Sequence, residues 1–217
     1  MKSFHSLLFR MIFYPFFPAA LFAFISLAAF EPEPGARTDE LRSGEKQGPV
    51  KKPFDLEEEL KRVNALIKED KNNANLFYNR AWVYENKGDL ESAEKDYSKA
   101  IEINEKHADA YYNRGLLYLK MERYVQAIKD FSKTIELKPE SVDAYCNRGN
   151  AYFLSGKTGL ALKDYNSALK LDGEDPDLYY NRAVIYFKRG ERQKAIVDLK
   201  KAASAGHELA RKYLDIL

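Results

Sequence analysis

The sequence is poor in the residues that build disulfides, metal sites and catalytic centres. It has one cysteine and three histidines, His5, His107 and His207, in 217 residues. A single cysteine excludes an internal disulfide, and so few histidines leave little material for a metal site. The formal net charge is only +2, so the chain also lacks the basic character of a nucleic-acid-binding protein.

Two short strings resemble known motifs but lack what the chemistry needs. The string from His207 to Arg211 starts like a zinc-protease helix, yet arginine stands where the second ligand is required. The string ending in Gly156, Lys157 and Thr158 satisfies a relaxed phosphate-loop pattern, but we expect it inside a helical repeat rather than between a strand and a helix. We therefore predict no catalytic residues, no metal, no nucleotide and no cofactor.

What the chain does contain is a strict internal period. An Asn-Arg pair recurs every 34 residues, within the strings FYNRAWVY, YYNRGLLY, YCNRGNAY and YYNRAVIY. A spacing held over four copies indicates a repeat architecture. Stacked repeats offer an extended surface rather than a closed pocket, so the period also bears on the class of function.

Each copy has the pattern of two helices. Counting from Ala74, Ala108, Val142 and Pro176 as position 1, position 4 is aromatic, position 8 is alanine or glycine, position 11 is tyrosine and position 20 is alanine. Spacings of three and four residues place these side chains on one face of a helix. Position 15 is glycine in three copies and Glu122 in the other, which predicts a break between two helices.

This frame resembles the tetratricopeptide repeat, and the match runs from Ala74 to about His207. The resemblance implies an all-α fold, a right-handed superhelix of antiparallel helix hairpins with a capping helix at each end. We expect the N-terminal capping helix in residues 54–73, repeats at 74–107, 108–141, 142–175 and 176–207, and a C-terminal capping helix at 208–217.

The first 53 residues have a different character. Residues 11–30 carry no charge and follow Lys2 and Arg10. As a helix they would reach about 30 Å, which suits a membrane anchor, and they also suit a cleaved signal peptide. Residues 31–53 hold four prolines and three glycines, which predicts a flexible linker. We expect the repeats outside the cytoplasm, either exported to the periplasm or medium or anchored to a membrane by residues 1–30.

Position 7 is arginine and position 23 is aspartate in every copy. The recurrence predicts structural ion pairs across or between hairpins, because arginine suits a two-point bond with a carboxylate. The alternative is a row of arginines offered to an acidic ligand. The residues are Arg80, Arg114, Arg148 and Arg182, with Asp96, Asp130, Asp164 and Asp198.

The resemblance also implies a peptide-binding groove lined by the first helices. Position 6 is asparagine in every copy, and its amide can hold the backbone of an extended peptide. The alternative is that asparagine merely tolerates a solvated helix face, or that neighbouring aromatics pack between hairpins instead. The predicted groove residues are Asn79, Asn113, Asn147, Asn181, Tyr78, Tyr112, Tyr180, Trp82, Leu116, Asn150, Phe153 and Phe187.

These patterns predict a non-catalytic interaction module that binds a protein or peptide as a scaffold or adaptor. The alternative is a self-assembling structural component at a membrane, built through the open ends of the stack. An enzyme would need a convergent acid, base or nucleophile, and the sequence suggests none. We expect no nucleic-acid or nucleotide partner, while a membrane tether and a homo-oligomer both remain open.

Overall fold

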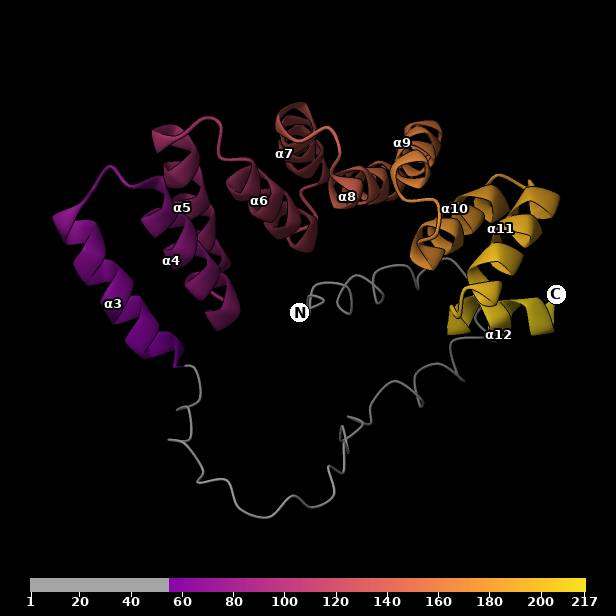
Figure 1. Cartoon of the computed structure of the whole chain (residues 1–217), viewed down its shortest axis with the longest axis horizontal. Coiled ribbons are helices and arrows are strands. Elements are labelled where there is room, and N and C mark those ends of the chain that lie inside the picture. The colour runs from indigo at the N-terminus through magenta and orange to yellow at the C-terminus, as the bar shows by residue number, and fades with distance from the viewer. Residues whose placement is uncertain (1–54) are drawn as a thin grey trace, which may run out of the picture. The chain divides into compact units, whose positions relative to one another are not determined.

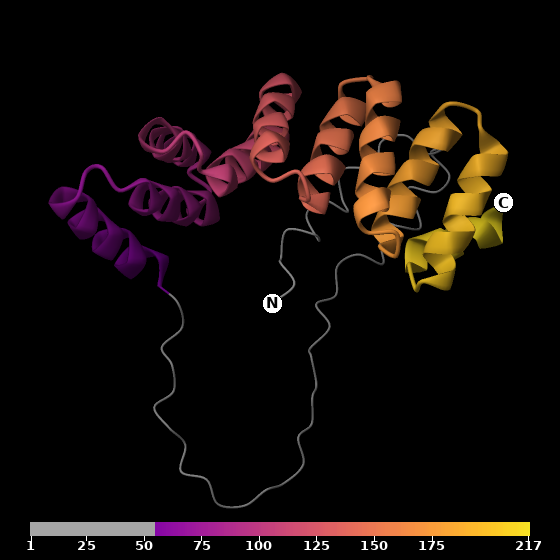
Figure 2. The same cartoon turned by 45° about the horizontal axis from the view of Figure 1, so that its top comes forward.

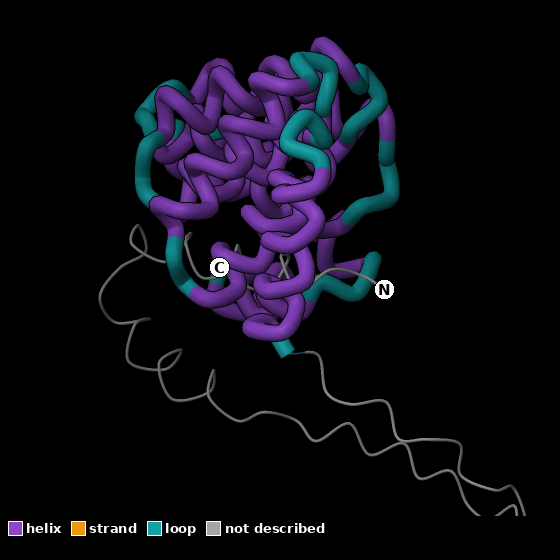
Figure 3. Tube along the Cα trace, turned by 90° about the vertical axis from the view of Figure 1, so that its left-hand side faces the viewer, coloured by secondary structure: helices purple, strands orange, loops and turns teal. Residues whose placement is uncertain are grey.

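A computed structural model describes residues 55–217 of the chain, within one compact unit, Pro53–Leu217. The signal or anchor segment and the linker predicted for residues 1–53 lie outside the described residues. Residues 55–217 form α-helices and no strand, as Figure 3 shows. The predicted all-α fold is therefore confirmed. None of the helices in this part of the chain is long and apolar enough to span a bilayer.

The helices follow one another in short, regular steps (Figure 1). Two of them lie in each predicted repeat, and one lies at each end of the series. Their bounds are α3 (Leu56–Glu69), α4 (Ala74–Lys87), α5 (Leu90–Ile103), α6 (Ala108–Lys120), α7 (Tyr124–Leu137), α8 (Val142–Leu154), α9 (Thr158–Leu171), α10 (Pro176–Lys188), α11 (Arg192–Ser204) and α12 (Glu208–Ile216).

Each first helix packs against the second helix of its own repeat and against the helix that precedes it, which is α3 for α4 and the second helix of the previous repeat for the others (Figure 2). The small residue at position 8 permits the close approach. A Cβ atom added to Gly115 would lie 2.8 Å from the ring of Phe131, closer than packed atoms come. Ala81 and Ala93, at positions 8 and 20, are completely buried beside Tyr97. Small residues therefore set the helix spacing, and large rings fill the remaining space.

Position 15 has the left-handed backbone conformation in all four repeats. Gly88, Gly156 and Gly190 have φ values of 83°, 82° and 76°, and Glu122 has φ 58°. Glycine adopts this conformation without steric cost, whereas a residue with a Cβ is strained there. The strain at Glu122 is a consequence of the hairpin geometry, which the remaining contacts of repeat 2 impose on this residue.

The two outer helices cover the ends of the series. On α3, Val63 and Ile67 are buried against Ala74 and Phe77 of α4. On α12, Ala210 is buried in a cluster with residues of α10 and α11. Both helices begin at a side chain that accepts a hydrogen bond from the first turn, Asp55 for α3 and His207 for α12.

Candidate functional site

Asparagine side chains on the first helices are hydrogen-bonded to the preceding repeat. The Nδ2 group of Asn113 donates to Oη of Tyr78 over 2.8 Å, and that of Asn147 donates to Oη of Tyr112 over 2.9 Å. In the next step Cys146 replaces the tyrosine, so Asn181 of repeat 4 has no phenol at the corresponding place. We call the two amide–phenol bonds the rungs. They join consecutive repeats and fix the orientation of each amide.

The rungs leave part of each amide available. A bond from Nδ2 uses one of two N–H groups, so the second N–H and the carbonyl oxygen of Asn113 keep their bonding capacity. Asn113 and Asn181 are half-buried, and Asn79 at the start of the row is exposed. Asn147 is only 9% exposed and presents the smallest surface of the four.

The acceptors of the rungs are neutral at physiological pH. Burial raises the pKa of Tyr78 and of Tyr112, and the carboxylates of Asp109 and Asp143 raise these pKa values further. Burial and nearby carboxylates raise the pKa of Cys146 to about 12. The two phenols and the thiol therefore keep their protons, and each rung is a bond between uncharged groups.

Other predicted groove residues are partly accessible. Trp82 and Leu116, both at position 9, are half-buried on α4 and α6. Tyr180 stacks on His207 with 4.3 Å between the ring centroids, and Phe187 packs against the cluster that holds α12 in place. These aromatic side chains thus have structural contacts as well as an accessible edge.

Two predicted groove residues lie in the interior instead. Asn150 is 0% exposed, and its Oδ1 accepts a hydrogen bond from the hydroxyl of Tyr165. Phe153 is 2% exposed. Positions 9 and 12 of repeat 3 pack against neighbouring helices. Burial of the polar Asn150 side chain is tolerated because its oxygen is hydrogen-bonded to Tyr165. We therefore leave both residues out of the candidate site.

A row of carboxylates runs beside the rungs. Position 2 is Asp109, Asp143 and Asp177 in the first turns of α6, α8 and α10. Asp109 is paired with Lys138 at 2.7 Å, and Asp177 lies 3.3 Å from Nε2 of His207. These charges complement helix N-termini. Lys138 offsets the charge of Asp109, and Asp143 and Asp177 add negative charge to the rim of the first helices next to the asparagine amides.

The predicted arginine–aspartate pairs are present in every repeat. Nε and Nη2 of Arg114 donate to the two carboxylate oxygens of Asp130 over 2.7 and 2.9 Å. The other three pairs have the same two-point geometry. Each pair joins the two helices of one hairpin. The carboxylates are buried, with exposures of 2–6%, so these arginines serve the fold and are not a row offered to an acidic ligand.

A third arginine nitrogen reaches the preceding repeat, which the sequence did not predict. Nη1 of Arg114 donates to Oγ of Ser98 on α5 over 2.9 Å. Asn64, Ser132 and Asn166 accept the corresponding bonds from Arg80, Arg148 and Arg182. The guanidinium also lies between the aromatic rings at positions 4 and 11, at 5.5 to 5.9 Å from their centroids.

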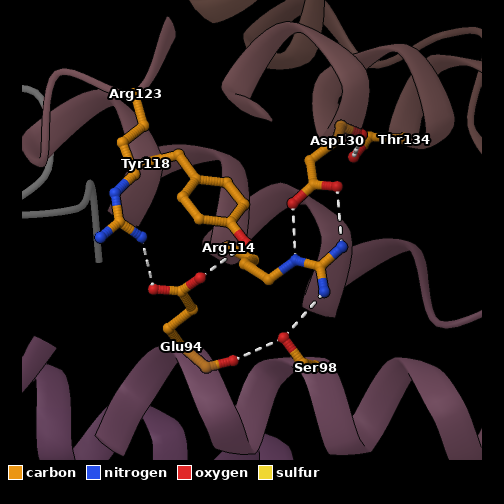
Figure 4. A network of polar contacts seen from close by, with 7 residues as sticks. All are labelled: Glu94, Ser98, Arg114, Tyr118, Arg123, Asp130 and Thr134. Atoms are coloured by element: carbon orange, nitrogen blue, oxygen red, sulfur yellow. Dashed lines mark hydrogen bonds and ion pairs between the residues drawn. The ribbon is translucent and has the colours of Figure 1, made fainter. Parts of the chain in front are cut away.

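Between repeats 1 and 2 the polar network extends further (Figure 4). Glu94 of α5 accepts from the hydroxyl of Tyr118 over 3.0 Å and from Nη1 of Arg123 over 2.8 Å. This carboxylate therefore bridges the outer helix of one repeat to the first helix of the next. The position of Glu94 is Ile128 in repeat 2 and Leu162 in repeat 3, so only the first junction between repeats has this bridge.

The first-helix surface can therefore offer oriented amides, half-buried aromatic and aliphatic side chains and an acidic rim. Such a surface is suited to holding a chain segment by hydrogen bonds and apolar contact. Within residues 55–217 no group of three or more His, Cys, Asp or Glu side chains is placed to hold a metal ion.

Comparison with known proteins identifies related sequences and folds. Models of the tetratricopeptide repeat match residues 108–141, 64–95 and 176–205, and a model described as TPR repeat matches 83–122 and 149–190. No curated protein sequence matches the chain.

Solved structures share the fold. A crystal structure of MamA is 22% identical, with a TM-score of 0.68 over 72% of this chain and 92% of that one. A structure described as "YrrB: a TPR protein with an unusual peptide-binding site" is 25% identical, with a TM-score of 0.67 over 74% and 84%. A structure of pilF from Pseudomonas aeruginosa is 20% identical, with a TM-score of 0.63 over 70% and 69%.

Proposed function

Because the chain belongs to the tetratricopeptide repeat family, we propose that it is a non-catalytic scaffold that binds an extended peptide segment of another protein. The proposed site is the surface of α4, α6, α8 and α10 around Asn79, Asn113, Asn147 and Asn181. Proteins of this family are generally interaction modules, and the similar YrrB structure is described as having a peptide-binding site.

The observation that carries the proposal is the set of rungs. Tyr78 and Tyr112 hold the amides of Asn113 and Asn147 in fixed orientations before any ligand arrives. A preorganised donor and acceptor bind more tightly than mobile ones, because less side-chain entropy is lost on binding. An amide held in this way can bond to the N–H and C=O groups of an extended backbone, whatever the peptide's sequence.

The charges beside the rungs favour one kind of peptide. Lys138 offsets the charge of Asp109, while Asp143 is exposed and Asp177 is half-exposed along the rim of the site. Their field attracts basic segments and repels acidic ones. We therefore propose that the preferred ligands are neutral or basic extended segments that carry an apolar side chain to contact Trp82 and Leu116.

The test is a screen of immobilised peptides with the full chain, followed by affinity measurements on the peptides that bind. The variant Asn113→Ala with Asn147→Ala removes two amides and should weaken binding about tenfold or more, because each lost bond is worth roughly 0.5–1.5 kcal/mol. Asn72→Ala with Gln126→Ala, two exposed amides that lie outside the first helices, is the matched control. Undiminished binding by the first pair would reject the site.

A second variant tests the preorganisation separately. Tyr78→Phe with Tyr112→Phe removes the hydroxyls that hold the amides but leaves the amides themselves. Affinity should fall about fivefold or more, since roughly 0.5–1.5 kcal/mol of ordering then accompanies binding for each of the two side chains. Light scattering on the same samples addresses self-assembly: a mass that rises with concentration would favour the structural alternative over a monomeric adaptor.

For location, we propose that residues 1–30 direct the chain out of the cytoplasm, as a cleaved signal or as an anchor. The proposal rests on the uncharged stretch at residues 11–30 and the basic residues before it. Sequencing the N-terminus of the mature protein tests it. A start between residues 28 and 32 indicates cleavage, a membrane-bound intact chain indicates an anchor, and an intact chain free in the cytoplasm would reject both.

A further inference from the structure

The outer surface of the last two repeats carries charge of one sign. The second helices α9 and α11 contain a single carboxylate each, Asp164 and Asp198, and both are buried in pairs with arginine. The exposed charges on these helices are therefore all positive. They are Lys163, Lys170, Arg192, Lys194, Lys200 and Lys201. In the sequence these helices are flanked by Asp172, which follows α9, and by Glu191, which precedes α11 and is paired with Arg189 and Lys194. Arg192 also donates to the main-chain oxygen of Leu217 over 3.3 Å.

Large apolar side chains are exposed among these lysines. Leu160 is 40% exposed, Leu171 is 47% exposed and Val197 is 54% exposed. Val197 lies one helical turn from Lys194 and Lys201, and Leu160 lies one turn from Lys163, so apolar and basic groups share the same face of each helix. We call the exposed face of α9 and α11 the outer basic face.

The two helices contribute to one surface. Arg182 of α10 donates to Asn166 of α9 over 2.6 Å and to Asp198 of α11 over 2.7 and 2.8 Å, so α9 and α11 flank the same guanidinium. A shallow hollow of about 330 Å³ lies beside it, with Lys194, Val197 and Lys201 in its lining. The only carboxylate in the lining is Asp198, which Arg182 already neutralises.

The first repeat supplies an internal contrast. The exposed face of α5 mixes both signs, and its shallow hollow is lined by Glu91, Glu94 and Glu102 as well as Lys95 and Lys99. Glu94 also bridges to the next repeat through Tyr118 and Arg123 (Figure 4). Between repeats 3 and 4, the position of this glutamate is occupied by Leu162. The single-sign face is therefore a property of repeats 3 and 4 and not of the repeat in general.

We propose that the outer basic face docks the protein on an anionic membrane surface. Lysines attract acidic headgroups, and exposed Leu160, Leu171 and Val197 add apolar contact at the boundary of the acyl chains. A nucleic acid would use the lysines but would gain nothing from exposed leucine and valine, since its binding is dominated by phosphate charge. The proposed peptide site lies on the first helices, so both surfaces can be occupied together.

The test is cosedimentation of the full chain with vesicles of phosphatidylcholine alone, or with one third phosphatidylserine. The variant K163Q/K170Q/K200Q/K201Q neutralises the outer basic face. The matched control K95Q/K99Q/K129Q/K133Q removes the same number of charges from α5 and α7. Residues 1–54 are common to all these proteins, so differences between variants report on the second helices alone.

We expect the first variant to bind anionic vesicles at least about tenfold more weakly than the control, since each lysine near such a surface is worth roughly fivefold. Equal losses in the two variants would overturn the proposal, because net charge alone would then explain the binding.

L160S/V197S should weaken vesicle binding several-fold at high salt, and an unchanged affinity would remove the apolar part of the argument. Binding of duplex DNA that depends on the same lysines, without vesicle binding, would overturn it in favour of a nucleic acid.

Discussion

Replacing Asp130 by alanine would leave the Arg114 guanidinium without its carboxylate in the interior of repeat 2. The Asp130 side chain is 2% exposed and that of Arg114 is 16% exposed, so water cannot replace the lost partner fully. Removing one member of a buried pair costs roughly 3–5 kcal/mol. Arg114 keeps its bond to Ser98 and its contacts with two aromatic rings. We therefore expect a loss of about 3 kcal/mol in the free energy of unfolding, at the lower end of that range.

The matched control lies on the same helix. Glu136→Ala breaks the pair with Lys133, which is 2.6 Å long but solvent-exposed, with Glu136 at 66%. Exposed pairs contribute between 0 and about 1 kcal/mol. Urea unfolding of the full chain followed by circular dichroism at 222 nm, the usual helix band, measures both variants. A loss for Asp130→Ala no larger than that for Glu136→Ala would refute the reasoning.

A double variant tests why the loss occurs. Burial raises the pKa of Asp130 even though Arg114 lies beside it, which means that desolvation outweighs the attraction between the two charges. A pair in this condition is a weak stabiliser, and its removal as a whole is tolerated better than removal of one partner. We expect Arg114→Leu with Asp130→Leu to be more stable than Asp130→Ala. A double variant that is less stable than the single one would show that the pair itself, and not the stranded charge, carries the energy.

Two further predictions concern the turns and the caps. Glu122→Gly should stabilise the chain by roughly 1 kcal/mol, because glycine relieves the strain at φ 58°, and Gly156→Ala should destabilise it by a comparable amount. Thermal unfolding of both variants measures the two changes in stability. Changes of the same sign in both variants would contradict the prediction. The Nδ1 atom of His107 accepts a hydrogen bond from the N–H of Ala110 at the start of α6, and burial lowers the pKa of His107. The neutral His107 cap therefore contributes its full stability above about pH 6.5, and that stability is lost as the pH falls through the lowered pKa. His107→Asn should keep the cap and lose less stability than the parent chain between pH 7.5 and pH 5, and an unchanged pH dependence would contradict the assignment.

The sequence determined the hairpins and the ion pairs because both depend on short, fixed spacings. Positions 7 and 23 are always 16 residues apart. In every copy the tight turn between the two helices brings the arginine at position 7 into contact with the aspartate at position 23. The same holds for the small residue at position 8, which must admit a ring such as that of Phe131. The period predicted that these contacts form, and the structure shows that each ion pair lies within one hairpin.

Features between repeats needed the tertiary structure. Asn113 bonds to Tyr78, 35 residues away, only because two hairpins stack at a particular angle and distance, and no spacing rule specifies that contact. Burial also differs between repeats at one position: Asn150 of repeat 3 is buried and bonded to Tyr165 of its own hairpin, whereas its counterpart Trp82 is half-buried. The period therefore defines what each repeat contains. Which side chains face a ligand is decided by the packing of one hairpin on the next, because that packing alone determines where water is excluded.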